Sequence, residues 1–159
     1  MKKFRNNGAV GALLDEYEKT ILELKETITS VTNQQLTIII DHKTRDPDCR
    51  SIQTILSHVI RAGYGYAIQV RKSLGEEIDY IDAKLLNSVE EYKKALNAMF
   101  TYNEQLFEEY SDLKIEEYDN EKKMLTRWGQ LYDIEQLMEH AIVHVLRHRR
   151  QIERFLIEM

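Results

Sequence analysis

Cysteine and proline are almost absent from this chain. Its 159 residues include one cysteine, Cys49, and one proline, Pro47. A single cysteine excludes an internal disulfide and a zinc site built from several thiolates of this chain, and this is typical of a protein of the reducing cytosol. Cys49 could be a reactive thiol or an ordinary small residue at a helix start. With only six glycines and abundant Glu, Lys, Leu and Ile, the composition favours helix.

Long apolar runs are missing as well. No stretch approaches the roughly 18 apolar residues of a membrane span, and the basic N-terminus reaches Asp15 and Glu16 before any such run develops, so we expect no signal peptide. The net charge of -5 argues against binding to the phosphate backbone of DNA or RNA. We therefore expect a soluble, cytoplasmic protein that binds neither nucleic acid nor membrane. Residues 1–159 should form a single domain with its own core, so that any metal would serve chemistry rather than folding.

Apolar residues recur at spacings of three and four in four long segments, which predicts four amphipathic helices. Their expected bounds are about Val10–Val31, Asp48–Leu74, the capping segment Asn87–Glu91 to Tyr110, and Asp133–Met159. Four helices of this length, joined by connections of mixed length, predict an all-α four-helix bundle.

Local sequence marks several ends of these helices. Asp46-Pro47-Asp48 indicates the start of the second helix, Gly75 is expected to cap its end, and Asp133 is the expected N-cap of the fourth. The connection from Ser111 to Asp133 is long for a bundle, and such segments are often functional. It could form a short hairpin around Asp119-Asn120-Glu121 or remain a solvated loop.

Two further features leave alternatives open. Gly63 and Gly65 lie inside the second helix, where they indicate either close helix packing or access for a ligand. Trp128 beside Gly129, just before the last helix, could wall the mouth of a pocket or plug the end of the bundle.

The last helix contains three of the five histidines, His140, His144 and His148, each four residues from the next and so near one face. Neighbouring imidazoles on one helix can bind zinc, nickel, iron or copper together. On a helical wheel, His148 falls inside the apolar stripe, His144 at its margin and His140 further towards solvent. His58 lies at the margin of the stripe of the second helix, so it could meet His144 and His148 in the interior.

Any one of these histidines alone is more simply a core residue. Two on one apolar stripe without partners would leave unsatisfied polar groups, which favours a mononuclear metal site formed by His58, His144 and His148. Neither H-x-x-x-H pair has the glutamate of zinc peptidases, and the Glu-x-x-His pairs of di-iron bundles are absent. Three ligands leave open positions for water or substrate, as in a catalytic site. The fifth histidine, His42, is expected to be solvated.

Other polar residues near the histidines are candidates for orienting the ligands or a substrate. Arg147 and Gln151 flank the His144 edge of the stripe and could act on an anionic substrate, although basic residues are also favoured near a helix C-terminus. His140 is either a bystander or an orienting group, and Trp128 is a candidate if it walls a pocket.

The closing motif reads His144-Val145-Leu146-Arg147-His148-Arg149-Arg150-Gln151-Ile152, and His58 stands in Ile55-Leu56-Ser57-His58-Val59. In these residues and in helix order the chain resembles the DinB-like (DinB/YfiT-like) superfamily of four-helix metalloproteins. That family carries one histidine in its second helix and an H-x-x-x-H pair in its fourth. The commonest family motif has a histidine and a glycine where this chain has Arg147 and Arg150.

The resemblance implies a bound divalent transition metal, with zinc or nickel expected first, and a homodimer. Characterised relatives include S-transferases and an isomerase that use low-molecular-weight thiols such as bacillithiol, mycothiol or glutathione. We therefore expect a metal-dependent enzyme of the thiol S-transferase type, acting on a small-molecule substrate with a thiol as co-substrate. The alternatives are a non-catalytic metal-binding protein of the stress response and a purely structural helical protein.

Overall fold

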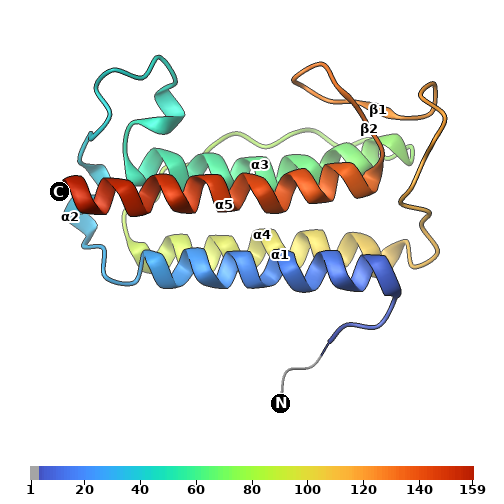
Figure 1. Ribbon diagram of the computed structural model, residues 1–159, viewed down its shortest axis with the longest axis horizontal. Coiled ribbons are helices and arrows are strands. Elements are labelled where there is room, and N and C mark those ends of the chain that lie inside the picture. Colours follow the sequence, from blue (N-terminus) through green and yellow to red (C-terminus); the bar gives the residue numbers. More distant parts are fainter. Residues whose placement is uncertain (1–3) are drawn as a thin grey trace.

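Four long helices dominate the computed structural model, which describes residues 4–159 (Figure 1). They are α1 Gly8–Thr27, α3 Ile52–Ser73, α4 Val89–Glu109 and α5 Ile134–Glu158. The shorter elements are α2 Asn33–Thr37, the 3-10 helix η1 Pro47–Cys49, and the two strands β1 Met124–Leu125 and β2 Leu131–Tyr132. The expected all-α helical bundle is thus confirmed. The expectations of one domain over 1–159 and of no signal peptide include residues 1–3, which lie outside the described residues.

Each long helix packs against two others. Helix α1 contacts α4 and α5, and α3 contacts the same two helices. Helices α1 and α5 run in one direction and α3 and α4 in the other (Figure 1). Because α3 and α4 are parallel, residues 74–88 must return along the length of the bundle to connect them. This crossover passes beside α3.

The core of the bundle consists of the apolar faces of the four helices. Among its fully buried side chains are Tyr17, Leu24, Ile55 and Leu96. Burial of side chains of this size contributes about 1.5–3 kcal/mol each relative to exposure. The described helices therefore enclose one common apolar core.

Polar contacts fix the crossover on α3. Ser57 donates to or accepts from the Tyr92 hydroxyl at 2.7 Å and also bonds the Lys84 carbonyl at 2.9 Å, while Gln53 donates to the Leu86 carbonyl at 2.8 Å. A segment without helix or strand needs such partners for its backbone groups. These bonds hold the crossover beside α3.

Several predicted helix ends are confirmed. Ser88 and Asp133 are the N-caps of α4 and α5, and each accepts a hydrogen bond from the backbone N–H three residues later. Gly75 follows α3 at φ +93°, where its N–H bonds the Lys72 carbonyl and the next N–H bonds the Arg71 carbonyl. This is the Schellman arrangement, which favours glycine because φ is positive.

Other bounds were wrong. Helix α3 begins at Ile52 instead of Asp48, because Ser51 forms a capping box with Thr54, and Asp46-Pro47-Asp48 starts the separate η1 turn. Helix α1 ends at Thr27 although the apolar pattern continues to Val31, which is buried in the turn that follows.

The connections also differ from expectation. A short helix, α2, lies in the connection after α1, where the apolar periodicity predicted no helix. The hairpin pairs Met124 with Tyr132, so its turn contains Trp128-Gly129 and does not lie around Asp119-Asn120-Glu121. Gly129 has φ +85°, which suits glycine in this turn.

Within residues 4–159, none of the helices combines the length and the apolarity that crossing a membrane requires.

Candidate metal centre

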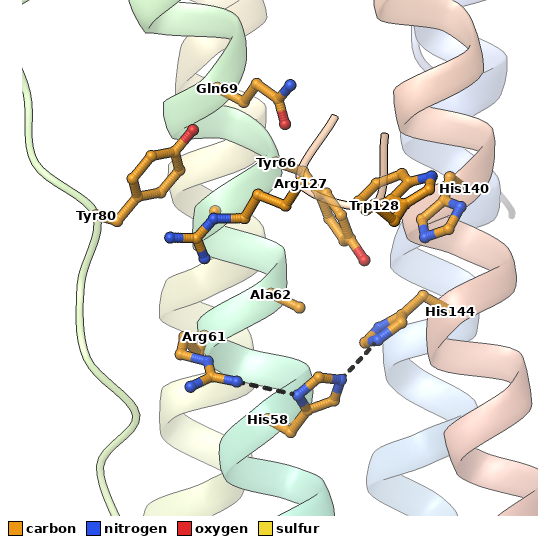
Figure 2. Close-up of a pocket in the computed structure, with 11 residues that line it drawn as sticks. His58, Arg61, Ala62, Tyr66, Gln69, Tyr80, Arg127, Trp128, His140 and His144 are labelled. Carbon is orange, nitrogen blue, oxygen red and sulfur yellow. Dashed lines mark hydrogen bonds between the residues drawn. The ribbon is translucent and has the colours of Figure 1, made fainter. Parts of the chain in front are cut away.

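Three imidazoles from two helices converge between α3 and α5. Helix α3 presents His58, and α5 presents His144 and His148, which are one turn apart. One ligand atom from each lies within 4.8 Å of the others. The Nε2 atoms of His58 and His144 are 2.9 Å apart (Figure 2), and the rings of His144 and His148 have centroids 4.5 Å apart. The predicted convergence of these three side chains is therefore present.

Two of the three imidazoles have an oxygen acceptor on the ring nitrogen Nδ1. His58 Nδ1 lies 3.1 Å from Asp48 Oδ2, and His148 Nδ1 lies 3.0 Å from Gln151 Oε1. Donation of an Nδ1–H to these oxygens leaves Nε2 unprotonated and able to bind a metal. Both imidazoles are thus oriented as metal-binding histidines usually are.

The η1 turn supports both acceptors. It contains Asp48, which also receives a hydrogen bond from Arg61 Nη2 at 2.6 Å, and its Cys49 carbonyl accepts from Gln151 Nε2 at 3.4 Å. The turn therefore links the surroundings of His58 on α3 to those of His148 on α5.

His144 is the most deeply buried of the three, at 8% exposure. Its Nδ1 is buried and has no hydrogen-bond partner in the part of the chain that the structure describes. Its Nε2 faces the Nε2 of His58, so two lone pairs would repel each other unless a proton or a cation lay between them. Separately, leaving the buried Nδ1 of His144 without a partner costs about 1–3 kcal/mol. A cation shared by the two imidazoles would turn this repulsion into attraction.

The protonation states also suit a metal. Burial, with the neighbouring His148 and His58, lowers the pKa of His144 to about 2, and burial likewise lowers the pKa of His148. Both imidazoles are therefore neutral near pH 7. Only a neutral imidazole has a free lone pair for a metal ion.

The spacing of the ring nitrogens is close to that of a tetrahedral metal site. Nitrogens bound to one tetrahedral zinc lie about 3.3 Å apart, given a Zn–N distance of about 2.05 Å. The His58–His144 pair at 2.9 Å is slightly closer, and the three ligand atoms stay within 4.8 Å of one another. Small rotations of the side chains would bring all three to that spacing, so the residues present fit a mononuclear three-nitrogen site.

A cavity of about 410 Å³ opens over His58 and His144 (Figure 2). This volume is in the range of small-molecule sites. Its lining combines the aromatic residues Tyr66, Tyr80 and Trp128, the arginines Arg61 and Arg127, and His140, with Ala62, Gly65 and Gln69. Among residues 4–159, no carboxylate belongs to this lining.

Trp128 and Gly65 lie at the cavity, whereas Gly63 lies in a closely packed part of α3. Trp128 lines the cavity and stacks on His140, with centroids 4.3 Å apart and an interplanar angle of 16°, so it does not plug the bundle end. Gly65 lines the cavity, whereas a Cβ on Gly63 would meet Met99 Sδ at 2.3 Å. Ligand access thus applies to Gly65 and close packing to Gly63.

The remaining candidates lie as follows. His140 is in the cavity wall, its ring 6.2 Å from that of His144, and Gln151 contacts His148. Arg147 is exposed and outside the cavity lining. His148 was expected to be more deeply buried than His144. That order was wrong, because His144 is buried and His148 is only partly buried. That order was taken from the apolar stripe of α5 alone, whereas α3 covers the position of His144.

For His42 and Cys49 the structure favours an ordinary role over a functional one. His42 is exposed in its loop. Cys49 is partly buried, and burial raises the pKa of its thiol, so the thiol is protonated near pH 7 rather than a reactive thiolate.

Sequence reasoning did not name Asp48 as part of the site, nor the cavity residues Arg61, Ala62, Tyr66, Gln69, Tyr80 and Arg127. Asp48 was interpreted only as a helix start, and Tyr80 and Arg127 belong to connections whose course no periodicity reveals. Arg61 could have been found, because it lies three residues after His58 on the same helix face.

Comparisons with family models, curated proteins and solved structures found no match for this chain. The resemblance to the DinB-like superfamily therefore stays a prediction from the histidine pattern, and any function must be argued from the site itself.

Proposed function

We propose that His58, His144 and His148 bind one divalent transition metal, zinc or nickel, in a protein of the DinB-like superfamily. The observation that carries this proposal is the placement of two oxygens: Asp48 Oδ2 and Gln151 Oε1 lie 3.1 Å and 3.0 Å from the Nδ1 atoms of His58 and His148. In the tautomers that donate to these oxygens, the Nε2 atoms are free to bind a metal. The buried Nδ1 of His144, which has no hydrogen-bond partner among the described residues, adds to it.

We further propose that the protein is a metal-dependent enzyme of the low-molecular-weight-thiol S-transferase type. Two supports are the apolar core of the bundle, which is large enough that we expect it to fold without a metal, and the cavity over His58 and His144, which gives a small-molecule substrate access to them. A divalent metal in this position would lower the pKa of a thiol that binds to it.

The side chains of the protein define what the cavity can do. The Cys49 thiol is protonated and does not line the cavity, so the reacting thiol would come from a co-substrate. The Tyr66 hydroxyl points into the cavity towards the histidines (Figure 2), and burial raises its pKa, so it stays protonated. It can therefore donate a hydrogen bond to a bound substrate.

Elemental analysis of the purified protein tests the metal. We expect about one metal ion per chain, lost when His144→Ala and His148→Ala are combined. The matched control is His42→Ala, because His42 is an exposed loop histidine. Full occupancy in the double variant would refute the ligand assignment.

Turnover is tested separately, on the fully metallated protein. Conjugation of 1-chloro-2,4-dinitrobenzene with bacillithiol, mycothiol and glutathione is followed with and without chelator. We expect chelator-sensitive conjugation with at least one thiol. A metallated protein that conjugates none of them would instead be the non-catalytic metal-binding protein of the stress response.

The resemblance also implies a homodimer in the cytoplasm, and we retain both as proposals. Sedimentation equilibrium of the metallated protein should give twice the mass of the chain. A monomer at all concentrations would remove the dimer from the proposal without affecting the metal site.

A further inference from the structure

The cavity over the histidines has an uncompensated positive charge. We propose that it binds an anionic small molecule with a flat apolar body, and that Arg127 holds the anionic group. This molecule would be the substrate of the proposed enzyme, so its role rests on the proposed function, whereas its binding does not require the metal.

Arg127 is placed for this role by two connections. It lies in the turn between β1 and β2, and its guanidinium carbon is 4.3 Å from the centroid of the Tyr80 ring, which belongs to the crossover. Figure 2 shows its side chain reaching across the cavity towards Tyr80. A guanidinium on an aromatic face is held by the π electrons, and its N–H donors remain available at the edge.

The charge of Arg127 has no carboxylate partner among residues 4–159, since no ion pair of its side chain is found there. Arg61, the other arginine of the cavity, differs because its Nη2 donates to Asp48 at 2.6 Å. In the part of the chain that the structure describes, the lining itself contains no acidic residue. Arg127 is therefore the group best placed to pair with an incoming carboxylate, which a guanidinium can bind through two parallel hydrogen bonds.

The rest of the lining suits a flat apolar body. The rings of Tyr66 and Trp128 meet edge to face, with centroids 6.4 Å apart and an interplanar angle of 84°, and form a corner of the cavity. Gly65 leaves the α3 side open, because a Cβ there would meet nothing within 4 Å. A planar ring can thus stack against aromatic walls while its charged substituent faces Arg127.

Trp128 provides a reporter for this cavity, because it is the only tryptophan of the chain. Three probes of nearly equal shape are titrated while its fluorescence is followed: 4-nitrobenzoate, the neutral 4-nitrobenzamide and the cationic 4-nitrobenzylammonium. The protein is first treated with chelator, so that a carboxylate cannot gain affinity from a metal. We expect 4-nitrobenzoate to quench Trp128 and to bind about tenfold more tightly than the amide, with the ammonium weakest.

Arg127→Met should abolish the preference for the carboxylate while leaving the affinity for the amide unchanged. Arg127→Lys should keep part of the preference, because the charge stays but the paired donors are lost. Arg150→Met is the matched control, since Arg150 is exposed on α5 and does not line the cavity. Arg127 is itself exposed on a hairpin turn, and circular dichroism checks that each variant is folded.

The proposal is overturned if the amide or the ammonium binds as tightly as the carboxylate, if none of the three binds, or if Arg127→Met retains the full preference. Failure of the proposed function looks different. If the protein as purified contains no metal but its chelated form prefers the carboxylate, the proposed metal centre is refuted and the anion site is supported. If the purified protein contains metal but its chelated form shows no such preference, the anion site is refuted and the metal centre is supported.

Discussion

Asp48 is the residue whose role in the site is easiest to isolate. Its carboxylate lies 3.1 Å from His58 Nδ1 and accepts from Arg61, and in the described part of the chain it forms no hydrogen bond with His144 or His148. Loss of such a partner typically lowers metal affinity about 10- to 100-fold, because the imidazole is no longer held in one orientation and tautomer. We expect Asp48→Ala to have this effect in a competition titration with a chromogenic zinc chelator.

The matched control for that titration is Asp112→Ala, which removes an exposed carboxylate from the connection after α4. It should leave the zinc affinity within twofold of the original. If Asp48→Ala behaved in the same way, Asp48 would not orient His58.

The lowered pKa of His144 makes the stability of the metal-free protein depend on pH. Its pKa is about 2 in the folded chain, mainly because of burial, with smaller contributions from the facing His148, His58, Arg147 and His140. The unfolded chain binds the proton near the ordinary pKa of about 6.5. The stability from this group is therefore fully present above about pH 6.5 and is lost as pH falls towards 2, at up to about 1.4 kcal/mol per pH unit.

Urea unfolding of the chelated protein at pH 7.5, 6.5 and 5.5 measures this dependence before most carboxylates titrate. We expect the free energy of unfolding to be nearly constant from pH 7.5 to 6.5 and to fall below that. The variant His144→Phe should show a smaller fall. An equal fall in both proteins would mean that His144 is not the group responsible.

At this scale the convergence of the three histidines was more predictable from the sequence than their surroundings. A spacing of four places His144 and His148 on one face of the last helix, and the margin position of His58 on the second helix allowed it to meet them. Periodicity within each helix was therefore enough to name the three residues. The roles of Asp48 and Arg127 were not predicted, since both residues reach the site from turns. The burial of the His144 side chain was not predicted either, because it depends on how α3 lies over α5.

At the scale of the element, α3 carries both the close packing and the access to the cavity. Gly63 faces Met99, which is fully buried, and a Cβ there would meet its Sδ at 2.3 Å, whereas Gly65 faces open space. We expect Gly63→Ala to lower the free energy of unfolding by about 1–3 kcal/mol through overpacking. Gly65→Ala should raise it by about 0.5–1 kcal/mol, because alanine is the better helix former.

The two glycine variants control each other in one urea titration, since both exchange a glycine for an alanine inside α3. Changes of the same sign and size would show that helix propensity alone governs these positions. Gly65→Ala should in addition weaken binding of 4-nitrobenzoate, because Gly65 lines the cavity.

The ends of the elements were predictable where one residue determines them. Ser88, Asp133 and Gly75 act through their own side chain or their own φ, so the sequence is enough. The start of α3 was missed because Asp46-Pro47-Asp48 is a genuine start of a helical turn, but of η1. The position of the hairpin was missed because two-residue strands show no periodicity.

At the scale of the whole molecule, the bundle was predictable and its arrangement was not. Apolar periodicity gave four helices, but it does not say that α1 and α5 are parallel or that residues 74–88 return along α3. The cavity depends on that arrangement, since its walls come from α3, α5, the crossover and the hairpin. Both long connections therefore take part in the candidate site, as segments of such length often do.

Because the core is formed by the helices themselves, removal of the metal should leave the fold intact. We expect the far-ultraviolet circular dichroism of the chelated protein to match that of the metallated one. Its melting temperature should fall by several degrees, since a ligand at 100 times its Kd stabilises by about 2.7 kcal/mol. Loss of helical signal on chelation would show that the metal is structural.

The central claim concerns the three histidines, and anomalous diffraction from crystals of the metallated protein tests it most directly. At the absorption edge of the bound metal, we expect one anomalous peak between α3 and α5, about 2.0–2.1 Å from a ring nitrogen of each of His58, His144 and His148. A peak at any other place, or a metal bound by fewer than these three imidazoles, would contradict the assignment.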